Sequence, residues 1–258
     1  MTGDERRDAA KVPAATLGFW GLKILATTLG ETGGDTLSMT FGLGYLVSSA
    51  VFLGALAILL VAQVSARRFR PLLYWVTIVA STTAGTTLAD FATRSLGIGY
   101  PGGALLLAAC VAGSLLLWRM AAGKIASDSI SGPVPEAFYW LTITASQTLG
   151  TALGDWAADT GGLGYSGGAI LFGSLLAVVA LLAWRTRISR VALFWAAFIL
   201  TRPLGATLGD LLDKPLDQGG FALNRPIASA VLAAAVLILV IVLPQRPGRH
   251  AGTQAGLR

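Results

Sequence analysis

The chain has 258 residues, of which 54% are hydrophobic and only 12% are charged, and its mean hydropathy is +0.69. A soluble domain carries about 25% charged residues, so this composition excludes an ordinary soluble fold. The net charge of +6 does not indicate a nucleic-acid partner, because the basic residues lie beside the apolar stretches, where Lys and Arg set membrane topology.

Residue types that build disulfides, soft-metal sites and catalytic triads are nearly missing. The single cysteine, Cys110, lies in an apolar run and excludes an intrachain disulfide. The single histidine, His250, lies in the polar tail and excludes a His-based metal site. Residues 1–12 lack an apolar core, so no signal peptide is expected. The pattern predicts no cofactor.

Four copies of one sequence block run along the chain, and such repeats indicate one structural unit used four times. Counted from a tryptophan at position 0, each block has a glycine at +10, a small residue at +14, an aspartate at +15 and a glycine at +24. The tryptophans are Trp20, Trp75, Trp140 and Trp195, and the aspartates are Asp35, Asp90, Asp155 and Asp210. In the first three copies the glycine at +24 belongs to a Gly-x-Gly-Tyr sequence that ends at Tyr45, Tyr100 and Tyr165.

Each copy is predicted to form a helix, a glycine-rich turn and a second helix, each helix having about the 20 residues that cross a bilayer. The first helices are predicted over about 14–38, 71–93, 136–158 and 190–212, and the second over about 45–66, 101–120, 166–184 and 224–243. The predicted fold is an all-α membrane protein with eight transmembrane helices in four parallel tandem helix-hairpin repeats.

The chain is predicted to be a single transmembrane domain over residues 1–258. The repeats are expected over about 12–66, 67–124, 132–187 and 188–244, with polar cytoplasmic tails over 1–11 and 245–258.

The four Trp-to-Asp blocks, over residues 12–244, resemble a known family. It is the bacterial integral-membrane family of four tandem two-helix repeats with a marked tryptophan, catalogued as a domain of unknown function. The resemblance implies eight spans and brings no activity, substrate or cofactor.

The distribution of Lys and Arg predicts the orientation in the membrane. The termini and the links between copies hold fourteen basic residues: Arg6, Arg7, Lys11, Arg67, Arg68, Arg70, Arg119, Lys124, Arg185, Arg187, Arg190, Arg246, Arg249 and Arg258. The turns inside the copies hold three: Arg94, Lys214 and Arg225. By the positive-inside rule, both termini are expected to be cytoplasmic in a multi-pass protein of the bacterial inner membrane, with the turns outside.

Polar side chains gather on one face of each first helix, at positions +7, +11 and +15, which are four residues apart. In chain order they are Thr27, Glu31 and Asp35; Thr82, Thr86 and Asp90; Gln147, Thr151 and Asp155; and Arg202, Ala206 and Asp210. The second helices are nearly bare of polar groups. The first helices are therefore predicted to form an inner bundle and the second helices to face lipid.

Charges inside the spans cost at least about 2.5–3.5 kcal/mol each and mark candidate functional sites. Five acids in the spans, Glu31, Asp35, Asp90, Asp155 and Asp210, exceed two bases, Lys23 and Arg202. This excess predicts an ion path for a cation or protons, with the five acids as candidate ligands for a hard metal ion. Thr27, Thr82, Thr86, Gln147 and Thr151 would add neutral oxygen ligands, and Arg202 and Lys23 would act as counter-charges.

The fourth copy departs from the others at position +7. Arg202 stands where the other copies have Thr27, Thr82 and Gln147, and Pro203 follows it. A buried arginine requires a carboxylate, so we expect it to pair with Glu31, with Asp210 as the reserve. A proline inside the helix is expected to kink it.

The favoured function is a membrane transporter or channel for a small cation (a hard divalent metal, an alkali ion or a proton-coupled solute). Its partners are the lipid bilayer and the cation or proton, and no oligomeric state follows from the pattern. Two alternatives stay open: an intramembrane carboxylate enzyme using Asp155 and Asp210, and a non-catalytic scaffold or partner subunit. In the scaffold reading the aspartates cap the following loops. Whichever function holds, the glycines at +10 and the small residues at +14 are predicted to pack helices and the tryptophans to anchor the membrane interface.

Overall fold

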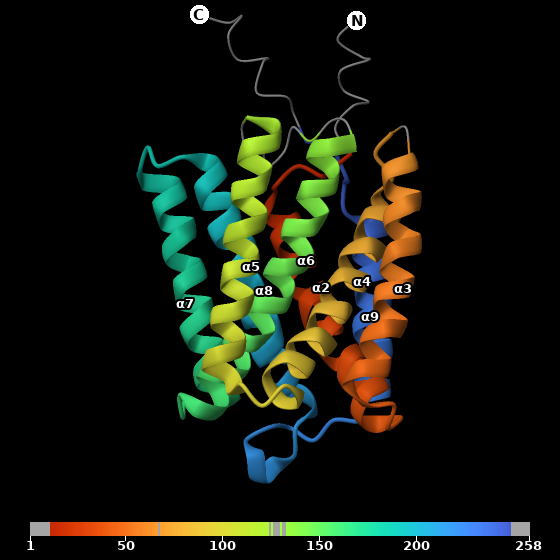
Figure 1. Cartoon of the computed structure of the whole chain (residues 1–258), viewed down its shortest axis with the longest axis vertical. Helices are drawn as coiled ribbons and strands as arrows, with labels where there is room; N and C mark the ends of the chain where they lie inside the picture. Colours follow the sequence, from red (N-terminus) through yellow and green to blue (C-terminus); the bar gives the residue numbers. More distant parts are fainter. Residues whose placement is uncertain (1–10, 67, 124, 126–129, 131–132, 249–258) are drawn as a thin grey trace, which may run out of the picture.

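In the computed structural model, long helices run side by side in one bundle, and the first and last described segments of the chain lie at the same end of it (Figure 1). The structure describes residues 11–248, apart from 67, 124, 126–129 and 131–132. Most of both predicted tails, with Arg67 and Lys124, therefore lies outside the described residues. We call the end at residues 11 and 248 the terminal end and the opposite one the turn end.

Eight long helices occur in the described part of the chain, in the order predicted. The first helices of the four copies are α2 (Leu17–Asp35), α4 (Pro71–Asp90), α6 (Pro133–Asp155) and α8 (Arg190–Asp213). The second helices are α3 (Gly44–Ser65), α5 (Gly99–Ala122), α7 (Gly164–Arg185) and α9 (Arg225–Val242). The predicted all-α membrane fold is confirmed.

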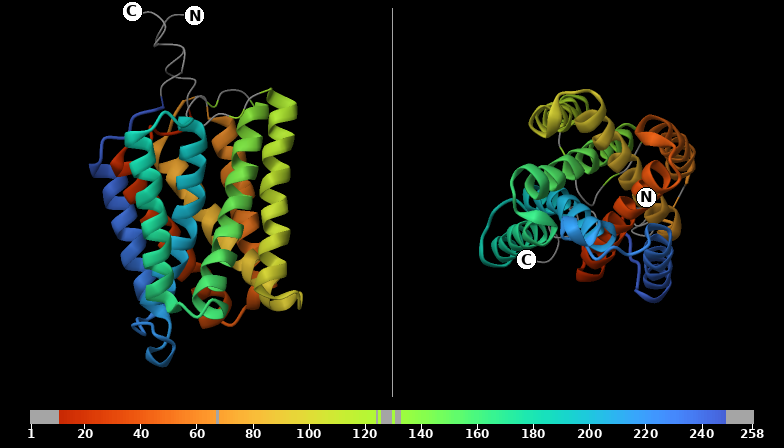
Figure 2. Two further views of the ribbon diagram at one scale, coloured as in Figure 1. Left: turned by 90° about the vertical axis from the view of Figure 1, so that its left-hand side faces the viewer. Right: turned by 90° about the horizontal axis from the view of Figure 1, so that it is seen from below.

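Six of these helices are long and apolar enough to cross a membrane. The remaining two, α2 and α6, run alongside the other six in the same bundle (Figures 1 and 2). Their sequences carry more polar and charged groups, such as Lys23 and Glu31 in α2. Because these groups face other helices and not lipid, α2 and α6 need not be apolar throughout.

The four first helices form a closed ring, in which α2 contacts α4, α4 contacts α6, α6 contacts α8 and α8 contacts α2. The second helices lie outside this ring (Figure 2, right). Only 11–22% of the residues in the apolar windows of α3, α5, α7 and α9 are buried, against 67% and 61% in α4 and α8. The predicted division into an inner bundle of first helices and an outer layer of second helices is confirmed.

Each second helix packs mainly on the first helix of the next copy. α3 contacts α4, α5 contacts α6, α7 contacts α8, and α9 returns to α2. A single copy is therefore an open hairpin, and its apolar faces become buried only when its neighbours are present.

Small residues let the ring helices approach closely. The glycine at +10 of each copy faces the side chain at +7 of the next: Gly30 faces Thr82, Gly85 faces Gln147, Gly150 faces Arg202, and Gly205 faces Thr27. A Cβ atom at any of these glycines would lie 3.1 Å or less from that side chain. The packing role predicted for these glycines is thus confirmed.

The Gly-x-Gly sequences form the turns between first and second helices. Both glycines of each pair have φ between 63° and 72°, in the left-handed region that other residues rarely adopt. The pairs are Gly42 and Gly44, Gly97 and Gly99, and Gly162 and Gly164. The requirement for two such residues explains why the signature recurs in three copies.

The terminal end of the ring is filled by aromatic side chains. Trp75, Trp140 and Trp195 are buried, and Trp118 packs edge-on against Trp195 with ring centroids 5.8 Å apart. The hydroxyls of Tyr74 and Tyr139 lie 2.9 Å apart in the same cluster. The prediction that these tryptophans anchor the membrane interface is therefore wrong for three of the four.

The N-terminal segment lies over this aromatic cluster. Val12 is buried in it, and Ala14 donates a backbone hydrogen bond to Arg246 near the C-terminal end of the described chain. Lys11 forms an ion pair with Glu136 of α6 at 2.9 Å and donates a hydrogen bond to the carbonyl of Val64. The terminal end is thereby closed by a layer of packed aromatic rings and chain.

Candidate functional site

Two polar layers lie inside the ring, and they contain the side chains predicted at +7, +11 and +15. The central layer, toward the middle of the bundle, comprises Lys23, Thr27, Glu31, Thr82, Thr86, Gln147, Thr151 and Arg202, all no more than 2% exposed. The carboxylate layer, at the turn end, comprises the repeat aspartates Asp35, Asp90, Asp155 and Asp210 with Arg94, Asp213, Lys214 and Arg225.

The central layer contains the predicted ion pair between the first and fourth copies. Arg202 Nη2 lies 2.9 Å from Glu31 Oε2, and both side chains are almost fully buried. Arg202 also donates to the Thr86 hydroxyl of α4 and, over 3.3 Å, to the Thr27 carbonyl of α2. One guanidinium thus joins three of the four ring helices, and the predicted pairing of Arg202 with Glu31 is confirmed.

Pro203 lies beside this pair and inside α8, which continues through it from Arg190 to Asp213. A Cβ atom added at Gly150 of α6 would lie 3.0 Å from the proline ring. The pyrrolidine ring of Pro203 thus lies in the close contact between α6 and α8. The kink expected at this position stays a prediction.

Lys23 is the second cation of the central layer. Its ammonium lies 3.2 Å from Gln147 Oε1 of α6 and 4.0 Å from the centre of the Phe198 ring. No carboxylate pairs with it among the described residues. Its assigned role as a counter-charge to the acids stays a prediction, because Glu31 pairs with Arg202.

Two basic side chains divide the carboxylate layer into two clamps. Lys214 bridges Asp35 of α2 and Asp210 of α8, at 2.6 and 3.0 Å. Arg94 bridges Asp90 of α4 and Asp155 of α6, at 3.0 and 3.2 Å. The four repeat aspartates therefore converge on one level of the bundle in two adjacent pairs.

Arg225 adds a third base at the start of α9. It lies 3.2 Å from Asp213 and 3.9 Å from Asp35. All three bases belong to the turns, where the distribution of Lys and Arg related them to topology alone. Two of them have a spacing that could have revealed their partners, because Arg94 and Lys214 each follow a repeat aspartate by four residues, one helical turn.

The repeat aspartates do not cap the loops that follow them. After Asp35, Asp90 and Asp155 the helices continue into five-residue π-helical turns, and none of the three side chains accepts a capping hydrogen bond there. These turns are Thr36–Thr40, Phe91–Ser95 and Trp156–Thr160. The capping alternative is wrong for these three aspartates, whose partners are basic side chains instead.

Three of the five candidate cation ligands come together. Glu31, Asp35 and Asp210 each place one carboxylate oxygen within 4.8 Å of the others, and all three are buried. The Oδ1 atom of Asp35 has no hydrogen-bond partner within the described chain. Asp90 and Asp155 share Arg94 and lie in the other clamp.

A cavity of about 440 Å³ opens at the turn end over the carboxylate layer. It is lined by residues from all four copies: Met39, Arg94, Asp159, Tyr165, Lys214, Pro215, Gln218 and Arg225. Burial lowers the pKa of Lys214, but the carboxylates of Asp210 and Asp35 raise it by more, so its pKa lies well above the usual range. Lys214 therefore stays charged between the cavity and the buried acids.

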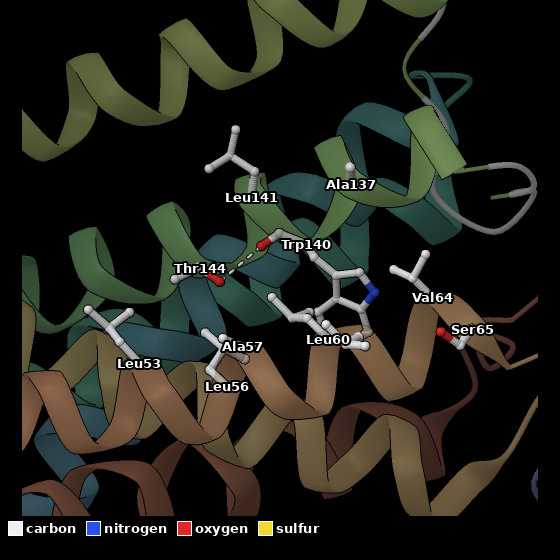
Figure 3. A pocket seen from close by; sticks show the side chains of 11 residues that line it. Leu53, Leu56, Ala57, Leu60, Val64, Ser65, Ala137, Trp140, Leu141 and Thr144 are labelled. Atoms are coloured by element: carbon white, nitrogen blue, oxygen red, sulfur yellow. Dashed lines mark hydrogen bonds between the residues drawn. The ribbon is translucent and has the colours of Figure 1, made fainter.

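A second hollow, of about 610 Å³, lies between α3 and α6 (Figure 3). Leu56, Leu60 and Leu141 lie on its walls, and Ser65 and Thr144 are its only hydroxyl-bearing residues. It contains no charged side chain, so it offers no site for an ion. Its apolar walls are suited to lipid acyl chains.

Comparison with known proteins gives a family and no activity. Four stretches of the chain, residues 18–69, 73–124, 138–189 and 193–244, match the family described as Repeat of Unknown Function (DUF347). No curated protein and no solved structure matches the chain. The matched stretches cover most of the sequence and correspond to the four copies of the Trp-to-Asp block, as the resemblance implied; the chain belongs to the DUF347 repeat family.

Proposed function

We propose that the protein transports a small cation, or a solute coupled to protons, along a path inside the ring of α2, α4, α6 and α8. The observation that carries this proposal is the group of Glu31, Asp35 and Asp210, whose carboxylate oxygens lie within 4.8 Å of one another beneath the cavity at the turn end. Buried carboxylates inside a membrane bundle are expensive, and ion and proton paths are where such groups occur.

The bases in these layers suggest how binding is coupled to movement. Arg202 and Lys214 hold the three carboxylates through ion pairs of 2.9, 2.6 and 3.0 Å. An incoming hard cation competes for the same oxygens, and binding would release the tethered bases to other partners. The packed aromatic layer at the terminal end would then have to open before the cation leaves on that side.

Transport is tested in proteoliposomes with a panel of Mg²⁺, Mn²⁺, Ca²⁺, alkali ions and protons. Glu31→Gln is expected to lower the flux of the transported ion about tenfold or more. Replacing even a residue that only hydrogen-bonds to a metal ligand lowers metal affinity or activity by about that factor. Flux is measured per folded protein. The double variant Glu31→Gln/Arg202→Gln, which removes both charges of the pair together, is expected to fold and to remain inactive.

Glu136→Gln is the matched control, because Glu136 is also buried and paired with a base but lies at the terminal end. It should transport at the wild-type rate. The proposal is abandoned if no cation of the panel crosses in wild type, or if Glu31→Gln and Glu136→Gln reduce flux equally.

We further propose that the terminal end faces the cytoplasm of a bacterial inner membrane, on the basis of the Lys and Arg distribution. In a Cys110→Ser background, Asp217→Cys in the exposed α8–α9 turn is expected to react with a membrane-impermeant thiol reagent added to intact cells. Arg187→Cys, exposed in the α7–α8 link at the opposite end, should react only after the membrane is opened. The reverse pattern would invert the orientation.

A further inference from the structure

The central layer carries one more positive charge than its acids balance. Lys23 and Arg202 are both 0% exposed, and Glu31 is the layer's one carboxylate. Glu31 pairs with Arg202, and both burial and the like charge of Arg202 disfavour a Lys23 ammonium that has no counter-charge of its own. Buried charges in proteins are paired, and an amide oxygen and an aromatic ring do not neutralise an ammonium.

The same layer has buried hydrogen-bond donors without partners. Arg202 Nε and Gln147 Nε2 have none in the part of the chain that the structure describes, and neither has the Thr82 hydroxyl. The Gln147 amide is oriented by Lys23, because its Oε1 accepts from the ammonium. Reversing the amide would direct an N–H at the ammonium, so the unpartnered Nε2 is a consequence of the arrangement.

These donors lie on one level of the ring. Lys23 of α2 contacts Gln147 of α6 directly. The Cβ and Cγ atoms of Arg202 pack against Gly150, and Gly150 follows Gln147 by about one turn of α6. On α4, Gly85 faces Gln147, and Thr82 precedes Gly85 by one turn. An ammonium, a guanidinium N–H, an amide N–H and a hydroxyl therefore belong to neighbouring contacts on the four helices of the ring.

We propose that the central layer binds a small monovalent anionic group, a halide or a carboxylate, between Lys23, Gln147 and Arg202. Its single negative charge balances the excess of one positive charge, and its lone pairs accept from the unpartnered donors. This anion site goes beyond the proposed cation path, and it stands or falls by binding alone, whether or not the protein transports.

The test is thermal unfolding of the purified protein in detergent, followed by tryptophan fluorescence, in sodium chloride or sodium acetate. Sodium gluconate at equal ionic strength is the reference, because its anion is much bulkier than chloride or acetate. Small anions are expected to raise the unfolding midpoint of wild type by a few degrees in a saturable manner, since a ligand of the folded state stabilises it. A response to chloride alone would identify a halide site, and a response to acetate alone would identify a site for the carboxylate of a solute. A response to both would show that the site accepts either kind of small anion.

Two variants make the test specific. Lys23→Met removes the unbalanced charge and should weaken the apparent affinity for the anion at least tenfold. Gln147→Glu places a carboxylate beside Lys23 and should raise the midpoint in gluconate and abolish the response to added anion. Lys11→Met, in which the lost base was paired with Glu136 at the terminal end, should respond like wild type.

The proposal is overturned by either of two results. One is a wild-type midpoint that is the same in chloride, acetate and gluconate. The other is an anion response of equal size in wild type, Lys23→Met and Gln147→Glu, which would be a general effect of salt. Because Gln147→Glu adds an acid and Lys23→Met removes a base, failure of one variant to fold leaves the other decisive.

Discussion

Removing either partner of the Glu31–Arg202 pair is expected to destabilise the protein more than removing both. The two side chains are 2.9 Å apart and almost fully buried, so Glu31→Gln leaves an arginine without a counter-charge and Arg202→Gln leaves a carboxylate without one. Breaking such a pair from one side costs about 3–5 kcal/mol, whereas replacing both charges often costs little. The double variant should therefore be closer in stability to wild type than either single variant is.

A double-mutant cycle on unfolding in mixed micelles measures this coupling. Lys11→Gln and Glu136→Gln provide a matched cycle on a 2.9 Å pair at the terminal end, where the Lys11 side chain is 16% exposed. Water screens that pair, and its coupling should be smaller. If the changes in unfolding free energy caused by Glu31→Gln and Arg202→Gln simply add, the two residues are uncoupled. Arg202 would then not act as the counter-charge of Glu31.

Gly205→Ala is expected to disrupt the closure of the ring between the fourth and first copies. A Cβ atom there would lie 2.9 Å from the carbonyl carbon of Thr27 and closer still to its side chain. The Thr27 hydroxyl donates to the Thr201 carbonyl of α8 over 3.1 Å at the same contact. Because backbone must move to make room, we expect a loss of about 1–3 kcal/mol, as overpacking gives.

Gly54→Ala in α3 is the matched control, because nothing lies within 4 Å of the Cβ atom it would introduce. Alanine favours the helix over glycine by about 1 kcal/mol, so this variant should be as stable as wild type or more stable. Equal behaviour of the two variants in thermal unfolding would show that the close contact at Gly205 does not limit stability.

The sequence by itself was sufficient for the features that depend on spacing along one helix. Positions +7, +11 and +15 share a face because they are four residues apart, and that face is polar, so its burial inside the ring could be predicted. The glycine at +10 and the small residue at +14 are also four residues apart, and this spacing assigned the glycines to helix packing. The pairing of Glu31 with Arg202 followed from charge, because each is the costly exception at its position in the repeat.

Only the tertiary structure decided which elements are neighbours across the bundle. Each second helix packs on the first helix of the next copy, α9 returns to α2, and the contact of α8 with α2 closes the ring. Helices in a membrane associate by the fit of their surfaces, which the spacing along one helix does not reveal. The same closure moves Trp75, Trp140 and Trp195 from the expected lipid interface into the ring.

The charge balance of the site also depended on the tertiary structure. From the sequence, the acids exceeded the bases, because Arg94, Lys214 and Arg225 belong to the turns. In the folded chain the turns bring these bases against Asp90, Asp35 and Asp213 respectively. Ion pairs form between groups that are close in space, whatever their separation in the sequence. A helical pattern could not reveal the pairing of Lys214 with Asp35 or of Arg225 with Asp213, because neither separation is one helical turn.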